Sequence, residues 1–151
     1  MINYILSKSN IMINYVGFTI VWFSCVYSGA KGDPIIALIP TFIFLLLHFL
    51  IVTDHLKEEI QLIVISIIFG LIVDSSFSIL GFVKYNGTLD FAPNLAPLWI
   101  VCMWAGFTAQ INHAMKFLIG RYPLICFYGL LAPLAYICLL YTSDAADEVV
   151  R

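Results

Sequence analysis

Charged residues are scarce in this chain, and their scarcity limits what it can do. Only 11% of the residues are Asp, Glu, Lys or Arg, against about 25% in a typical soluble domain. No basic stripe and no glycine-rich phosphate loop occurs, so the sequence does not support binding of nucleic acid or nucleotides. GxSxG, HExxH and zinc-ligand patterns are also missing. We therefore expect no catalytic residues, no cofactor and no metal, and a non-enzymatic role is favoured over an enzymatic one.

Paired cysteines are missing as well. The four cysteines fall singly inside apolar stretches, at Cys25, Cys102, Cys126 and Cys138. Without a CxxC pair, metal-binding and thioredoxin-like interpretations have little support. We expect these residues to be small, buried and apolar.

Apolar residues, in contrast, are abundant: they make up 62% of the chain, and its mean hydropathy is +1.01. A bilayer core of roughly 30 Å needs about 20 helical residues. Five apolar runs approach this length, at residues 11–29, 34–53, 60–83, 95–114 and 123–141. The sequence therefore predicts an all-α, polytopic helical membrane protein, a bundle of five transmembrane helices in a single domain over residues 1–141.

The C-terminal residues differ in composition from the rest. Residues 138–148, Cys-Leu-Leu-Tyr-Thr-Ser-Asp-Ala-Ala-Asp-Glu, resemble a translated sequencing adaptor. On that interpretation the natural chain was cut near Ile137, a sixth helix was lost, and residues 142–151 are a disordered tail that is not native. The alternative is an acidic cytoplasmic tail.

The positions of lysine and arginine predict the orientation, because these residues are enriched in cytoplasmic loops. With five spans, four basic residues share the N-terminal side and two share the other. The first group is Lys8, Lys57, Lys116 and Arg121, and the second is Lys31 and Lys84. We expect a multi-pass protein of the bacterial inner membrane with a cytoplasmic N-terminus.

Asp74 is the main ionisable residue at membrane depth. Such a residue costs roughly 2.5–3.5 kcal/mol to insert, so it needs a partner or a function. Similar depths along the predicted helices suggest Ser24, Thr41 and Tyr136 as its neighbours. Two interpretations stay open: a proton or cation site, or a neutral carboxyl that hydrogen-bonds hydroxyl groups and ties helices together.

A second polar cluster is predicted at the cytoplasmic face. It comprises His48, Gln110, Asn112, His113, Lys116 and Arg121. These residues suit a pocket for an anionic lipid head group, or they are helix-end groups that reach water. Two histidines without a nearby carboxylate are a weak metal signal. Trp99 and Trp104 are expected to be lipid-facing or interfacial anchors.

Several short motifs together resemble a known family. In chain order they are Gly70-Leu-Ile-Val-Asp-Ser75, Gly81-Phe82, Ala96-Pro-Leu-Trp99, Trp104-Ala-Gly-Phe-Thr-Ala-Gln-Ile-Asn-His113 and Ala132-Pro-Leu-Ala-Tyr136. Over about residues 12–137 the chain resembles the domain of unknown function family 2878, a group of bacterial inner-membrane proteins. The resemblance implies location and fold but no reaction.

Two functional hypotheses follow from these observations. The first is a non-enzymatic accessory or scaffold protein, with membrane lipid metabolism or envelope stress as its setting and with membrane lipids, a second copy or another membrane protein as partners. The second is a small transporter or proton/cation-coupled carrier that uses Asp74. They differ in whether Asp74 faces a water-filled cavity or a dry helix interface.

Overall fold

The computed structural model describes residues 2–53 and 55–131, with side chains from residue 11 onward. The chain divides into two units, residues 1–114 and 115–151, and each is described by itself. The end of the fifth apolar run with Tyr136, the adaptor-like residues 138–148 and the predicted tail at 142–151 lie outside the described residues.

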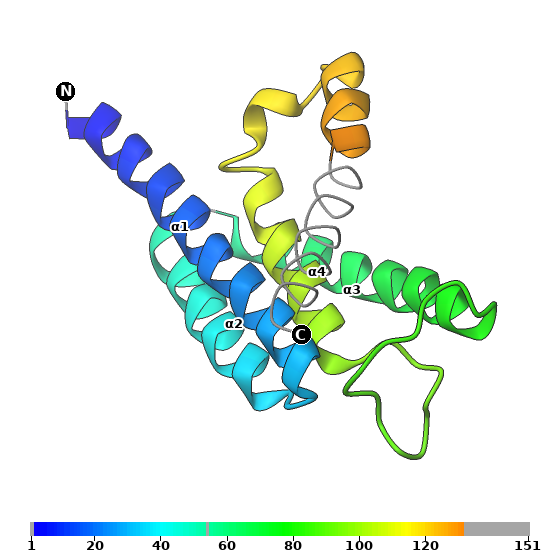
Figure 1. The fold of residues 1–151 in the computed structure, drawn as a ribbon. Coiled ribbons are helices and arrows are strands. Elements are labelled where there is room, and N and C mark those ends of the chain that lie inside the picture. Colours follow the sequence, from blue (N-terminus) through cyan, green and yellow to red (C-terminus); the bar gives the residue numbers. More distant parts are fainter. Residues whose placement is uncertain (1, 54, 132–151) are drawn as a thin grey trace, which may run out of the picture. The chain divides into compact units, whose positions relative to one another are not determined.

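The first unit is a set of apolar helices (Figure 1). Its helices are α1 (Ile2–Lys31), α2 (Ile35–Leu47) with the π-helical turn η1 (His48–Val52), α3 (Leu56–Ile79) and α4 (Leu98–Ile111). Apart from one isolated bridge between Leu89 and Ala92, the described residues contain no β-structure. The predicted all-α fold class is confirmed.

Three helical segments are long and apolar enough to cross a membrane. They are Ile11–Lys31, Ile35–Val52 and Leu56–Ile79. Many of their large apolar side chains point outward, including Phe42, Leu50 and Ile72, each more than 60% exposed. Water would make such a surface costly and lipid does not, so this is the architecture of a helical membrane protein.

Helix α3 begins and ends about one turn earlier than the run predicted at 60–83. Glu58 and Glu59 lie in its first turn, where negative charge interacts favourably with the helix dipole. At the other end Gly81 has a φ of 75°, a left-handed conformation that glycine adopts at low cost and that stops helices. Glu59 therefore belongs to the helix and not to a loop.

Helix α4 is shorter than the span predicted at 95–114. Pro97 precedes it in extended conformation, and proline has no N–H with which to continue a helix toward its N-terminus. The helix has 14 residues, so its length is about 21 Å, less than a hydrocarbon core of about 30 Å.

In the second unit, η2 (Lys116–Leu118) precedes an apolar helix at Tyr122–Leu131. This helix includes the described part of the fifth predicted run. Cys126 is exposed on it, whereas Cys25 and Cys102 of the first unit are buried as predicted.

Close packing joins α1, α2 and α4, and α3 packs against α4. The buried core consists of Val21, Cys25, Ala37, Phe44, Ile63, Cys102, Ala105 and Ala109. Glycines face large side chains at these contacts: Gly17 of α1 lies against Phe44, and Gly106 of α4 lies against Val21. Small residues let apolar helices approach closely in a membrane, and this packing positions the polar groups described next.

Candidate functional site

Both carboxylate oxygens of Asp74 accept hydrogen bonds. The Tyr85 hydroxyl donates to Oδ1 at 2.6 Å, and the Trp104 indole Nε1–H donates to Oδ2 at 2.8 Å. Asp74 thereby ties α3 to α4 and to the loop that follows α3. The side chain is half-buried at this junction.

The neighbours predicted for Asp74 bond elsewhere. The Ser24 hydroxyl donates to the Ile20 carbonyl within α1, and the Thr41 hydroxyl donates to the Ala37 carbonyl within α2. Hydroxyls in apolar helices readily make such bonds one turn back. The hydrogen bonds to Asp74 thus come from Tyr85 and Trp104 and not from Ser24 or Thr41, and Tyr136 lies outside the described residues.

A glycine explains why Trp104 reaches Asp74. Gly70 lies one helical turn before Asp74, and a Cβ at Gly70 would collide with the Trp104 indole ring. The bare backbone lets the ring lie against α3 with its N–H toward Asp74. Trp104 is therefore a hydrogen-bond donor inside the unit and not only the lipid-facing anchor predicted. The sequence offered one sign of this role, because an indole N–H that lies away from water needs a hydrogen-bond acceptor.

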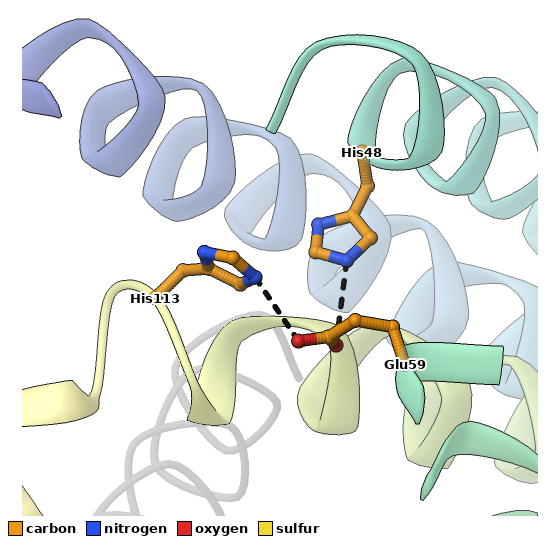
Figure 2. A group of neighbouring side chains, drawn as sticks. All are labelled: His48, Glu59 and His113. Atoms are coloured by element: carbon orange, nitrogen blue, oxygen red, sulfur yellow. Dashed lines mark hydrogen bonds and ion pairs between the residues drawn. The ribbon is translucent and has the colours of Figure 1, made fainter. Parts of the chain in front are cut away.

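A second carboxylate, Glu59, lies between two histidines (Figure 2). Its Oε1 is 3.2 Å from His113 Nε2, and its Oε2 is 3.6 Å from His48 Nε2. The ring centroids of the two histidines are 5.1 Å apart. The side chains of His48 and Glu59 are 0% and 6% exposed, and that of His113 is 21% exposed.

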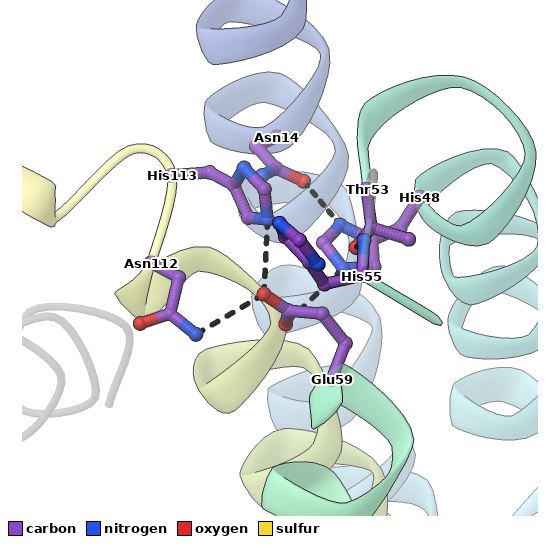
Figure 3. Close-up of polar contacts among 7 residues, drawn as sticks. All are labelled: Asn14, His48, Thr53, His55, Glu59, Asn112 and His113. Atoms are coloured by element: carbon purple, nitrogen blue, oxygen red, sulfur yellow. Dashed lines mark hydrogen bonds and ion pairs between the residues drawn. The ribbon is translucent and has the colours of Figure 1, made fainter. Parts of the chain in front are cut away.

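Two asparagines complete this group (Figure 3). Asn14 Oδ1 lies 3.0 Å from His48 Nδ1, and Asn112 Nδ2 donates to Glu59 Oε1 at 3.1 Å. The five residues Asn14, His48, Glu59, Asn112 and His113 are called the Glu59 site below. They come from α1, η1, the first turn of α3 and the two residues that follow α4, so four segments meet there.

The orientation of the Asn14 amide, with Oδ1 toward His48, sets which nitrogen of His48 carries hydrogen. Oδ1 of an asparagine only accepts, so Nδ1 of His48 is the donor and a neutral ring has its lone pair on Nε2. That lone pair faces the acceptor Oε2 of Glu59. Among the described residues, His48 Nε2, Glu59 Oε2 and Asn14 Nδ2 are buried without a hydrogen-bond partner.

Comparison with known families now gives the chain its place. The family model described as a protein of unknown function (DUF2878) matches residues 11–144. The chain belongs to this family. No curated protein and no solved structure matches the sequence. The matched range includes Asp74 with its two donors and every residue of the Glu59 site.

In this DUF2878 protein, part of the predicted cytoplasmic-face cluster lies together. His48, Asn112 and His113 meet around Glu59, and Gln110 is buried one turn earlier on α4. Lys116 and Arg121 belong to the second unit. Because a carboxylate lies at the centre, the structure does not favour the predicted pocket for an anionic head group.

The expectation that the histidines have no carboxylate nearby is wrong. Glu59 stands just before the apolar run predicted at 60–83, where a charged residue attracts no notice. Asn14, a polar residue inside the first apolar run, was the other available signal. His48, Glu59 and His113 each offer one donor atom, and the three atoms lie within 4.8 Å of one another. Two imidazoles and a carboxylate are a ligand set used for zinc and iron.

Proposed function

We propose that this DUF2878 chain is a multi-pass, non-enzymatic accessory protein of the bacterial inner membrane that works through the Glu59 site. The observation that carries this proposal is the buried carboxylate of Glu59 between two histidines. The distribution of lysine and arginine supports placing this end of the helices toward the cytoplasm.

The pairing within the Glu59 site favours a function over a purely structural role. Polar groups that only stabilise a fold are expected to satisfy one another, since an unpaired buried group costs about 1–3 kcal/mol. Here a lone pair of His48 faces a carboxylate oxygen of Glu59. A positive charge between these two acceptors would satisfy both, so the site suits a bound cation or proton.

Asp74 differs from Glu59 in this respect. Each of its oxygens accepts a hydrogen bond, from Tyr85 and from Trp104. A carboxyl paired in this way stabilises the contact between helices. These bonds favour a structural role for Asp74 over the carrier role considered from the sequence.

Matched replacements of the two carboxyls by amides test the proposal. In Glu59→Gln the new N–H₂ group donates to His48 Nε2 while Oε1 still accepts from Asn112, so we expect the free energy of unfolding to rise by about 1 kcal/mol. In Asp74→Asn the amide gains no new hydrogen-bond partner, so we expect no increase in the free energy of unfolding. Reversible unfolding of the purified protein in mixed detergent micelles measures both values.

The sign of the Glu59 effect decides the outcome. A site kept for function is often a site of reduced stability, so its removal stabilises the fold. If Glu59→Gln lowers the free energy of unfolding as much as Asp74→Asn or more, Glu59 is a structural residue and the proposed function is wrong.

A further inference from the structure

We propose that the Glu59 site binds one divalent transition-metal ion through Nε2 of His48, a carboxylate oxygen of Glu59 and Nε2 of His113. The inference rests on the proposed function in taking the site as functional, and it names the ligand class. It is carried by the spacing of the donor atoms, by their burial and by the bond from Asn14.

The spacing of the donor atoms fits a tetrahedral ion. Bonds of about 2.0–2.2 Å to nitrogen and oxygen place two ligand atoms of such an ion about 3.4 Å apart. Glu59 Oε2 lies 3.6 Å from His48 Nε2, and Glu59 Oε1 lies 3.2 Å from His113 Nε2. One donor atom from each of the three residues lies within 4.8 Å of the other two, so a bound ion would draw the farthest pair together by at most about 1.4 Å.

The donor chemistry selects the class of ion. Imidazole nitrogen suits zinc, iron, nickel and copper, whereas magnesium and calcium prefer all-oxygen sites. The Glu59 carboxylate offsets part of the ionic charge in a poorly solvated place. His113 Nε2 lies 3.2 Å from Glu59 Oε1. Because an ionised carboxylate only accepts, Nε2 carries the hydrogen in the metal-free site, and metal binding requires this hydrogen to move to Nδ1. That nitrogen can carry it, since the His113 side chain is partly exposed.

Asn14 acts as a positioning residue for His48. Ligating histidines commonly donate their other ring N–H to an oxygen, which fixes the tautomer and the ring orientation. Asn14 is 0% exposed, and its Oδ1 is the acceptor for His48 Nδ1–H. A fully buried asparagine in an apolar helix is costly, and this bond gives it a role. Loss of such a partner typically weakens metal affinity 10–100-fold.

Titration of the full chain with Co²⁺ tests the inference. The protein is purified in detergent with any histidine tag removed, Co²⁺ binding is followed by visible absorption, and Zn²⁺ is added as competitor. We expect one Co²⁺ per chain, with the intense d–d bands of a tetrahedral site, and displacement by Zn²⁺. Glu59→Gln and His113→Gln should each weaken binding more than about 100-fold, and Asn14→Leu about 10–100-fold.

Two control variants define what specific binding means. His55→Gln removes an exposed histidine at the start of α3, and Asp74→Asn changes the other carboxyl; both should leave Co²⁺ affinity unchanged. Helical circular dichroism and a monodisperse elution profile show that each variant is folded. If Glu59→Gln does not fold, His113→Gln tests the metal site in its place, because His113 is the most exposed of the three ligands.

The possible results separate this inference from the proposed function. If Co²⁺ does not bind saturably, or binds equally well to Glu59→Gln and His113→Gln, the metal site is wrong. If Glu59→Gln nevertheless stabilises the fold, the Glu59 site holds a proton and the proposed function stands. If Co²⁺ binds as expected but Glu59→Gln destabilises the metal-free protein, the metal site stands and the proposed function, which was argued from the unpaired atoms, is wrong.

Discussion

At the scale of single residues, the carboxyls of Asp74 and Glu59 differ in how their oxygens are paired. Asp74 has a donor for each oxygen, whereas Oε2 of Glu59 faces the lone pair of His48. The sequence identified Asp74 because it interrupts an apolar run. Glu59 was overlooked because it stands at the edge of one, where charged residues are ordinary. The sequence thus placed a polar residue on a helix, but it did not predict which way the side chain points.

The indole of Trp104 supplies one prediction at this scale. Trp104→Phe keeps an aromatic ring against Gly70 but removes the donor to Asp74 Oδ2, so we expect a loss of about 1 kcal/mol in the free energy of unfolding. Trp22→Phe is the matched control, since within the described residues the Trp22 indole makes no hydrogen bond and has only an edge contact with Phe23. Equal effects of the two substitutions would contradict the role given to Trp104.

At the scale of elements, the sequence predicted the existence of the helices better than their bounds. Apolar runs indicated α1, α2, α3 and α4 because lipid contact requires apolar side chains over whole helices. The bounds depended on local chemistry instead: acidic residues extend the start of α3, and Pro97 shortens α4. One turn at the start of α3 decided whether Glu59 belonged to the helix.

The contact between α3 and α4 supplies a second prediction. Gly70→Ala places a Cβ where the Trp104 ring lies, so the ring or the helices must move and the bond to Asp74 is strained. We expect a loss of about 1–3 kcal/mol, as for overpacked cores. Gly129→Ala is the control, because a Cβ there meets nothing within 4 Å and alanine favours a helix by about 1 kcal/mol. Unfolding in detergent measures both, and a Gly70→Ala protein as stable as the parent would contradict the close packing described here.

At the scale of the whole molecule, composition alone predicted a helical membrane protein, and the structure agrees. The polar site could be predicted only in part. His48, Asn112 and His113 stand at the ends of apolar runs, so a shared face was expected, but their convergence on Glu59 and Asn14 depends on how four segments pack. The spacing of these residues in the sequence does not predict how the four segments pack.

Orientation in the membrane is the prediction at this scale. Single cysteines introduced into a cysteine-free chain should react with a membrane-impermeant reagent from outside when they lie in the 84–94 loop. Those placed at 116–121 should react only after the cells are opened, since basic residues favour the cytoplasmic side. The reverse labelling pattern would place the Glu59 site at the outer face.

The arrangement of the Glu59 site can be measured directly through its histidines. The chain has three, His48, His55 and His113, and imidazole ¹⁵N NMR of selectively labelled protein resolves their nitrogen shifts. We predict that Glu59→Gln shifts the signals of His48 and His113 together and leaves His55 unchanged, and that Asp74→Asn shifts none of the three. If Glu59→Gln alters only one histidine of the pair, or neither, the carboxylate does not lie between them and the account of this site is wrong.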